Sequence, residues 1–162
     1  MYEYSVVLGS YAKNMSLPGE RIGYLIASPS MPDKESFMGG VIMASRVLGF
    51  INAPVVGQKL LKYALGKGVD LEIYARRREA MARVLTEAGY EFTMPRGAFY
   101  FFPKAPGGDD QAFNAALAKE LILGVPGRGF GAPGYFRLAF CVGEEVINRS
   151  ADGFKRAIDA MK

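Results

Sequence analysis

The sequence has 162 residues, of which 50% are hydrophobic, and a formal net charge of +4. Because the sequence contains no histidine, it can form no Ser-His or Cys-His nucleophile pair and no histidine-based metal site. Because it contains a single cysteine, it can form no intrachain disulfide. Its apolar runs are far shorter than the ~20 residues that cross a bilayer. Its basic residues are scattered along the chain except at Arg76-Arg77-Arg78, which is followed by the acidic Glu79. We therefore expect a cytoplasmic globular protein that binds neither membranes nor nucleic acid.

The chain begins with two predicted strands. Apolar runs at residues 4–8 and 21–27 are each followed by turn residues, and the first run is expected to break at Gly9-Ser10. Lys13 falls in the connection just after a strand end. Open α/β sheets usually bind their ligands at such positions.

Two helices and a hinge are expected next. Helical periodicity covers residues 33–46 and resumes after a break, ending near residue 65. The segment Gly66-Lys67-Gly68 is a candidate hinge between two domains. We therefore divide the chain into residues 1–69 and residues 70–162.

The second part predicts three helices packed on a small sheet. Asp70 can cap a long helix that ends at Gly89. The remaining elements follow in the order of strands at 90–93 and 98–102, a helix from Asp109-Asp110, a Gly/Pro-rich loop at 124–134, a strand at 135–142 and a helix with Ile147, Ala151, Phe154 and Ile158 on one face. The pattern as a whole indicates an α/β or α+β fold.

The predicted strand at residues 135–142 contains two residues of interest. Cys141 lies in an apolar run and is expected to be buried as a small hydrophobic residue, with catalysis as the alternative. Arg137 is costly to bury unless it is paired. Its partner could be an anionic ligand or an internal Asp or Glu.

A lysine motif carries the strongest functional signal. Ser10, Lys13 and Arg21 fall at relative positions 0, 3 and 11, with Gly19 and Gly23 beside the arginine. This spacing resembles the lysine motif of fold-type I, class I/II aminotransferases, which use pyridoxal 5'-phosphate. The resemblance implies that Lys13 is the catalytic Schiff-base lysine and that Ser10 and Arg21 bind the cofactor phosphate. The alternative is a solvated loop lysine, a turn serine and a surface arginine.

The same resemblance extends along the chain. Residues 134–140 are similar to the family's strand that carries an arginine for the substrate α-carboxylate, which implies this role for Arg137. Three further segments resemble the family's Asn-x-Pro, Gly-Ala-Phe-Tyr and Pro-Gly-x-x-Phe-Gly motifs. They offer additional substrate-site candidates, namely Asn52, Tyr100 and Phe130.

The resemblance implies a fold and a function for the chain. Residues 1–69 would be the end of the large, α/β cofactor-binding domain with the interdomain helix, and residues 70–162 a small α+β C-terminal domain of the aspartate aminotransferase type. The chain would be the C-terminal portion of a homodimeric enzyme that moves an amino group between an amino acid and a 2-oxo acid, and would be inactive by itself. A pyridoxal-phosphate lyase or decarboxylase and a non-catalytic regulatory or dimerisation module are the alternatives.

Overall fold

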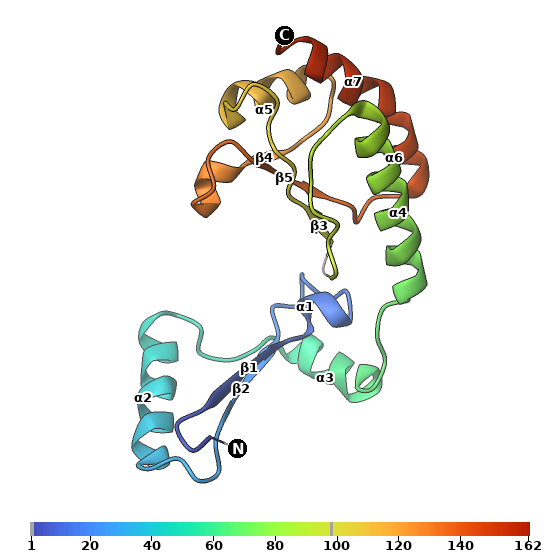
Figure 1. Cartoon of the computed structure of the whole chain (residues 1–162). Helices are drawn as coiled ribbons and strands as arrows, with labels where there is room; N and C mark the ends of the chain where they lie inside the picture. The colour runs from blue at the N-terminus through green and yellow to red at the C-terminus, as the bar shows by residue number, and fades with distance from the viewer. Residues whose placement is uncertain (1, 98) are drawn as a thin grey trace. The chain divides into compact units, whose positions relative to one another are not determined.

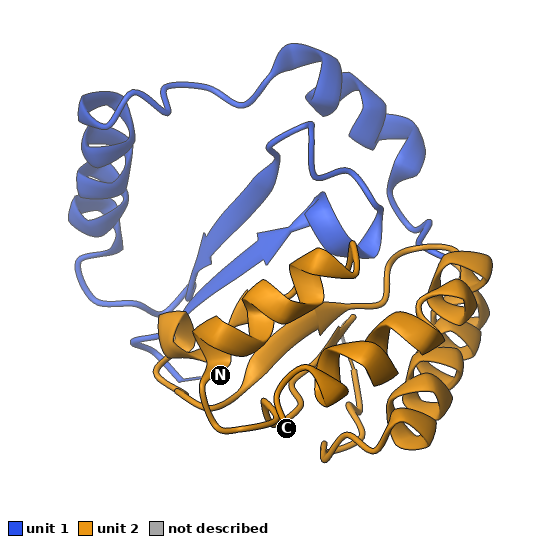
Figure 2. Cartoon of the chain, turned by 90° about the horizontal axis from the view of Figure 1, so that it is seen from above, with its two compact units in different colours: residues 1–69 blue, residues 70–162 orange. Residues whose placement is uncertain are grey.

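The computed structural model describes residues 2–97 and 99–162, and its helices and strands confirm the predicted mixture of α and β structure (Figure 1). The chain divides into two compact units, Met1–Val69 and Asp70–Lys162 (Figure 2). This division falls at the residues expected from the hinge, whereas the assignment of the units to domains of a larger enzyme stays a prediction. Within the described residues, no helix is both long and apolar enough to cross a bilayer.

The first unit contains a two-stranded antiparallel sheet, in which β1 (Val6–Ser10) pairs with β2 (Gly23–Ala27). The predicted break of the first strand at Gly9 is wrong. Gly9 pairs with Tyr24, whose ring fills the space that a Cβ at Gly9 would need, so a glycine allows the strand to continue. The second strand begins later than predicted because Arg21 has a φ of 52°, in the left-handed region that interrupts a strand.

Three helices complete this unit, namely α1 (Tyr11–Asn14), α2 (Lys34–Val47) and α3 (Val55–Ala64). The longer two confirm the helical periodicity of the sequence. The short helix α1 was not predicted. It begins at Ser10, whose Oγ accepts a hydrogen bond from the main-chain N–H of Ala12 at 3.2 Å.

The first unit buries little apolar surface of its own. Ile22 is the one buried hydrophobic residue among those described in this unit, and α2 contributes none. Apolar side chains that are more than half exposed lie on both strands and both longer helices, and include Val7, Leu8, Ile26, Met43, Val47, Val56 and Tyr63. Exposed apolar area of this extent is typical of a surface that packs against further protein.

The second unit packs helices against a three-stranded antiparallel sheet with the strand order β3-β5-β4 (Figure 1). Its long first helix begins as predicted at Asp70, whose carboxylate accepts the N–H of Glu72 at 2.9 Å, and ends at Gly89, with a φ of 89°. The elements are α4 (Leu71–Ala88), β3 (Tyr100–Phe101), α5 (Asp110–Lys119), β4 (Val125–Pro126), the 3-10 helix η1 (Gly127–Phe130), β5 (Phe136–Ala139), α6 (Glu144–Arg149) and α7 (Ala151–Asp159).

An aromatic cluster forms the core of the second unit. The ring of Tyr90 makes edge-on contacts with Phe113, Phe136 and Phe154 at centroid distances of 5.9, 5.8 and 5.6 Å. Its hydroxyl donates a hydrogen bond to the main-chain oxygen of Phe154 at 3.0 Å. Other fully or nearly fully buried members are Met81, Val84, Leu85, Phe101, Leu117, Leu138, Phe140, Ile147 and Ala157. The second unit therefore has its own hydrophobic core.

Replacing Tyr90 with phenylalanine is expected to lower the free energy of unfolding by ~1 kcal/mol at neutral pH, because one buried hydrogen bond is lost. Burial also raises the pKa of the Tyr90 phenol above its ordinary value of 10.0. The unfolded chain therefore releases this proton at lower pH than the folded chain, so stability declines as the pH rises above 10. Urea unfolding near neutral pH and above pH 10 would measure both effects.

The control is Tyr63→Phe, which removes a hydroxyl from a residue that is 72% exposed. It should change neither the free energy of unfolding at neutral pH nor its decline above pH 10. A Tyr90→Phe variant that loses as much stability as the wild type at alkaline pH would contradict this prediction.

The strand predicted at residues 90–93 is absent. The segment makes one main-chain hydrogen bond to its neighbour, from the N–H of Lys104 to the oxygen of Glu91 at 2.9 Å, and no ladder follows. Tyr90 and Phe92 both pack against the core. One-sided burial of alternate residues therefore produced the strand-like pattern without strand pairing.

The other two predicted strands are shorter than expected. β3 keeps two residues of the strand predicted at 98–102, of which Ala98 lies outside the described residues, and β5 keeps four of those at 135–142. The length of β5 is limited by its neighbours, because β3 and β4 have two residues each. The Gly/Pro-rich loop, in turn, contains β4 and η1, which the sequence did not predict.

The expected burial of Cys141 is wrong, because the residue is exposed. Alternate residues of the segment face the core, namely Phe136, Leu138 and Phe140. Cys141 is out of phase with them and shares the opposite side with Arg137. The predicted final helix is also interrupted, because Ser150 separates α6 from α7.

Candidate functional site

Ser10 and Arg21 lie together in the first unit. Ser10 ends β1 and faces Gly23 across the sheet, and Arg21 lies just before β2. These three residues line one cavity of ≈ 190 Å³ together with Ala12 and Ile22. The structure therefore brings together the two residues that the sequence predicted as phosphate ligands.

The donors at this cavity suit an anion. Arg21 uses one guanidinium nitrogen to donate to the main-chain oxygen of Pro18 at 3.1 Å, and within residues 2–97 and 99–162 no carboxylate forms an ion pair with it. Ser10 Oγ accepts from the N–H of Ala12, so its own proton remains for a second bond. A guanidinium fork with a short hydroxyl donor is a common arrangement for phosphate.

Lys13 lies on α1, the short helix that directly follows Ser10. The helix is anchored at its far end, where the oxygen of Asn14 accepts a hydrogen bond from the N–H of Val69 at 2.9 Å. The side chain of Lys13 is exposed. The lining residues of the Ser10 and Arg21 cavity include its neighbour Ala12 but not Lys13.

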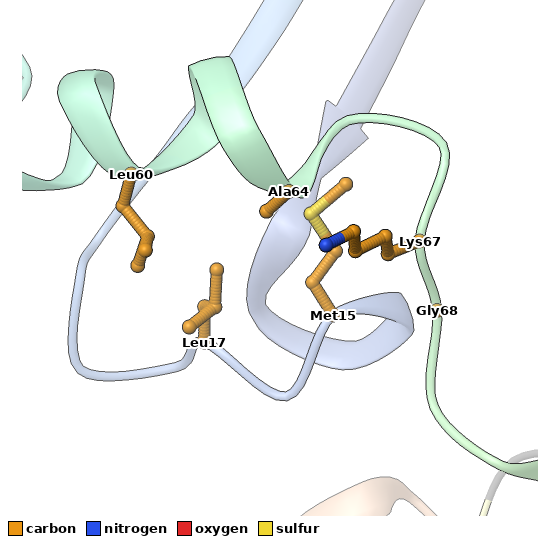
Figure 3. A pocket seen from close by; sticks show the side chains of 6 residues that line it. All are labelled: Met15, Leu17, Leu60, Ala64, Lys67 and Gly68. Atoms are coloured by element: carbon orange, nitrogen blue, oxygen red, sulfur yellow. The ribbon is translucent and has the colours of Figure 1, made fainter.

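A second cavity shows how the segment after Lys13 packs on α3. Its volume is ≈ 220 Å³ and it is mainly apolar, lined by Met15, Leu17, Leu60, Ala64, Lys67 and Gly68. Figure 3 shows that the amine of Lys67 points toward the side chain of Met15. Lys67 belongs to the same unit as Lys13 and does not line the cavity of Ser10 and Arg21, which makes it a useful control for lysine chemistry.

Three predicted substrate residues meet in the second unit. The guanidinium carbon of Arg137 lies 4.4 Å from the ring centre of Tyr100 and 4.5 Å from that of Phe130. Among the residues that the structure describes, no carboxylate forms an ion pair with Arg137, so an internal salt bridge is not found. The aromatic rings support the cation while leaving its hydrogen-bond donors to another partner.

Asn52, the fourth substrate candidate, is exposed in the break between α2 and α3. It belongs to the first unit, whereas the Arg137 cluster belongs to the second. Its role therefore stays a prediction from the sequence.

The sequence did not reveal an ion pair beneath the loop that carries Phe130. The buried carboxylate of Asp110, at the start of α5, accepts hydrogen bonds from Arg128 Nε at 3.0 Å and Arg128 Nη2 at 2.7 Å. The main-chain N–H of Arg128 donates to the other carboxylate oxygen at 2.9 Å. These contacts with Arg128 hold the pKa of Asp110 far below its usual range.

No metal site accompanies these groups, since no cluster of three or more metal-ligating side chains occurs within the described part of the chain. The candidate site residues described above are one lysine, two arginines and a serine.

Comparison with known proteins gives a family and several relatives. Residues 1–154 match the family described as aminotransferase class I and II. A probable aspartate/prephenate aminotransferase of Aquifex aeolicus is 31% identical over 94% of this chain and 40% of its own length. A (5-formylfuran-3-yl)methyl phosphate transaminase of Methanocaldococcus jannaschii is 28% identical over 97% of this chain and 43% of its own length.

Solved structures show the same relationship. An aminotransferase from Eubacterium rectale superposes with a TM-score of 0.88 and 37% identity, covering 99% of this chain and 40% of its own. Aspartate aminotransferase from Thermotoga maritima gives a TM-score of 0.80 and 28% identity, covering 95% of this chain and 40% of its own. The chain thus spans about 40% of the length of these relatives and matches their C-terminal portion.

Proposed function

Because the chain belongs to the class I and II aminotransferases, we propose that it supplies the catalytic lysine and part of the cofactor and substrate sites of a pyridoxal-phosphate enzyme. The enzyme would transfer an amino group between an amino acid and a 2-oxo acid. The observation that carries this proposal is the cavity shared by Ser10 and Arg21 next to the helix that bears Lys13.

Ser10 and Arg21 would hold the phosphate of the cofactor. The hydroxyl of Ser10 would donate a hydrogen bond to this phosphate, and the guanidinium of Arg21 would offer it a charged pair of donors. When bound, pyridoxal phosphate supplies a reactive carbonyl carbon and a ring that accepts electrons. The donor set of this chain fits the phosphate portion of that molecule.

Lys13 would hold the cofactor through its amine and then move a proton at the substrate Cα. Lysine suits both tasks because its amine can be deprotonated, whereas arginine stays charged. Arg137 would bind the substrate α-carboxylate and so orient the Cα–H bond for proton removal. Tyr100 and Phe130, whose rings the Arg137 guanidinium contacts, would keep that guanidinium in place.

We propose that turnover needs two further components. One is the part of the relatives' fold that this chain does not span, and the other is a second subunit, whose site Asn52 of this chain would approach. The complete enzyme would act in the cytoplasm. The proposal is supported by the length of the chain relative to its relatives and by the exposed apolar side chains of the first unit. The 162-residue chain by itself is expected to bind the cofactor weakly and to lack transaminase activity.

Reductive trapping would test this function. A chimera would join the preceding part of the Thermotoga maritima enzyme to residues 1–162, and both the chimera and the 162-residue chain would be incubated with pyridoxal phosphate and borohydride. Peptide mapping should find one label per chimera at Lys13, less at Lys13 of the shorter chain, and none at Lys67. A folded chimera that transfers amino groups without a label at Lys13, or a chain of 162 residues that is fully labelled and active, would contradict the proposal.

A further inference from the structure

The Asp110 carboxylate accepts three hydrogen bonds from Arg128, and a main-chain hydrogen bond from Gly134 also acts on it. It binds both the main-chain N–H and the guanidinium of Arg128, at 2.9 Å and at 2.7–3.0 Å. The side chain of Asp110 is only 1% exposed, whereas that of Arg128 is 45% exposed. A main-chain bond fixes where Arg128 lies, and two guanidinium bonds fix its orientation.

Capping of α5 does not explain this carboxylate. Asp109 already performs that task, because its Oδ1 accepts the N–H groups of Gln111 and Ala112 at 3.0 and 3.2 Å. Asp109 is also exposed, and its contact with Arg128 is longer, at 3.3 Å. The two adjacent aspartates therefore have different roles.

The anchored residue lies in the tight loop that carries Phe130. The N–H of Gly131 donates to the oxygen of Arg128 at 3.2 Å, and the N–H of Ala132 donates to the oxygen of Gly127 at 3.0 Å. No side chain fits at Gly127, where a Cβ would collide with the main-chain oxygens of Ala132 and Tyr135. The loop is therefore tightly closed, and its main chain is attached to the rest of the unit at Gly127, whose N–H donates to the oxygen of Tyr135 at 2.7 Å, and at Arg128.

Phe130 itself has little burial to fix its position. Its side chain is 50% exposed, and its ring contacts are with Arg137 at 4.5 Å and with the ring of Phe102 at 6.2 Å. The main chain must therefore place the ring. The main-chain contact nearest to Phe130 that reaches outside the loop is the one between Arg128 and Asp110.

We propose that Asp110 is a positioning residue of the Arg137 site: by holding Arg128 it places the ring of Phe130 against the Arg137 guanidinium. The role of Arg137 in binding a substrate carboxylate rests on the proposed function, but the placement of Phe130 does not. Asp110 acts through Arg128 and Phe130 and touches no substrate.

The NMR signal of the Arg137 side-chain Nε–H tests the placement in the 162-residue chain. Aromatic rings close to a guanidinium shift this signal, and Arg137→Lys identifies it by removing it. Phe130→Leu gives the shift expected when one ring is lost. Asp110→Ala and Asp110→Asn should move the signal most of the way toward the Phe130→Leu position, and Arg128→Ala part of the way.

Asp109→Asn is the matched control, because it removes one negative charge near Arg128 while asparagine still caps α5. It should leave the signal at its wild-type position. If Asp110→Ala does not fold, the position of the Arg137 signal in Asp110→Asn and Arg128→Ala tests the proposal. Asp110 variants with a lower melting temperature but an unchanged Arg137 signal would show a purely structural residue and overturn the proposal.

Kinetics of the chimera separate this proposal from the function on which it partly rests. Asp110→Asn should raise KM for the amino acid by ~10-fold, since small misplacements of a binding group cost ~10- to ~100-fold, while kcat changes much less. A wild-type chimera without transaminase activity would reject the proposed function but leave the NMR result to judge Asp110. An active chimera with an unmoved Arg137 signal in the Asp110 variants would reject the positioning role alone.

Discussion

Replacing Lys13 with arginine is expected to lower the transaminase rate of the chimera by at least ~10³-fold, because the lost group would both hold the cofactor and transfer the substrate proton. Arginine keeps the positive charge and most of the length of the side chain. It cannot be deprotonated, so it can neither bond covalently to the carbonyl nor act as a base. The measurement is formation of the 2-oxo acid product, together with the fraction of protein labelled after borohydride reduction.

Lys67→Arg is the matched control for Lys13→Arg, because Lys67 lines the neighbouring apolar cavity in the same unit. The control should keep both the rate and the labelling of the wild type. Phosphate binding at Ser10 and Arg21 should survive in both variants, since neither lysine lines their cavity. A Lys13→Arg enzyme that retains more than a tenth of the wild-type rate would reject Lys13 as the catalytic lysine.

Replacing Arg137 with leucine is expected to weaken binding of the amino acid by at least ~2 kcal/mol, or ~30-fold in KM, because the carboxylate would lose its charged partner. Arg137→Lys should recover only part of this loss. Lysine restores the charge but not the planar fork that binds two carboxylate oxygens and stacks on Tyr100 and Phe130. Steady-state kinetics with both variants would measure the effect.

A substrate without a carboxylate sharpens the test of Arg137. For a simple amine, Arg137→Leu should leave KM unchanged, because no group of that substrate contacts the guanidinium. Arg96→Leu, which removes an exposed arginine from the same unit, should alter the kinetics of neither substrate. An equal loss for the amino acid and the amine would show that Arg137 supports the fold rather than the carboxylate.

Elements with local signals were predicted well from the sequence. The boundaries of α4 follow from Asp70 and Gly89, whose capping roles depend only on nearby main-chain groups. Strands were predicted less well because their length depends on partners far along the chain. Residues 90–93 show this clearly, since they have the apolar alternation of a strand but no neighbour with which to form a ladder.

The candidate site shows the same contrast between local and distant signals. The resemblance to the aminotransferase lysine motif implied that Ser10 and Arg21 lie together, and the pairing of β1 with β2 brings them to one cavity. The bond between Asp110 and Arg128 was not predicted, because it joins residues 18 apart in the chain through a loop whose closure depends on tertiary packing. A buried acidic residue beside a capping aspartate has no sequence signature of its own.

The left-handed main chain of Arg21, with its φ of 52°, sets folding stability against binding. A residue with a Cβ loses ~1–2 kcal/mol in this region, and glycine would not. Glycine would, however, remove the guanidinium that faces the cavity with Ser10. Folding stability alone would therefore favour glycine at position 21, whereas anion binding at this cavity requires the arginine.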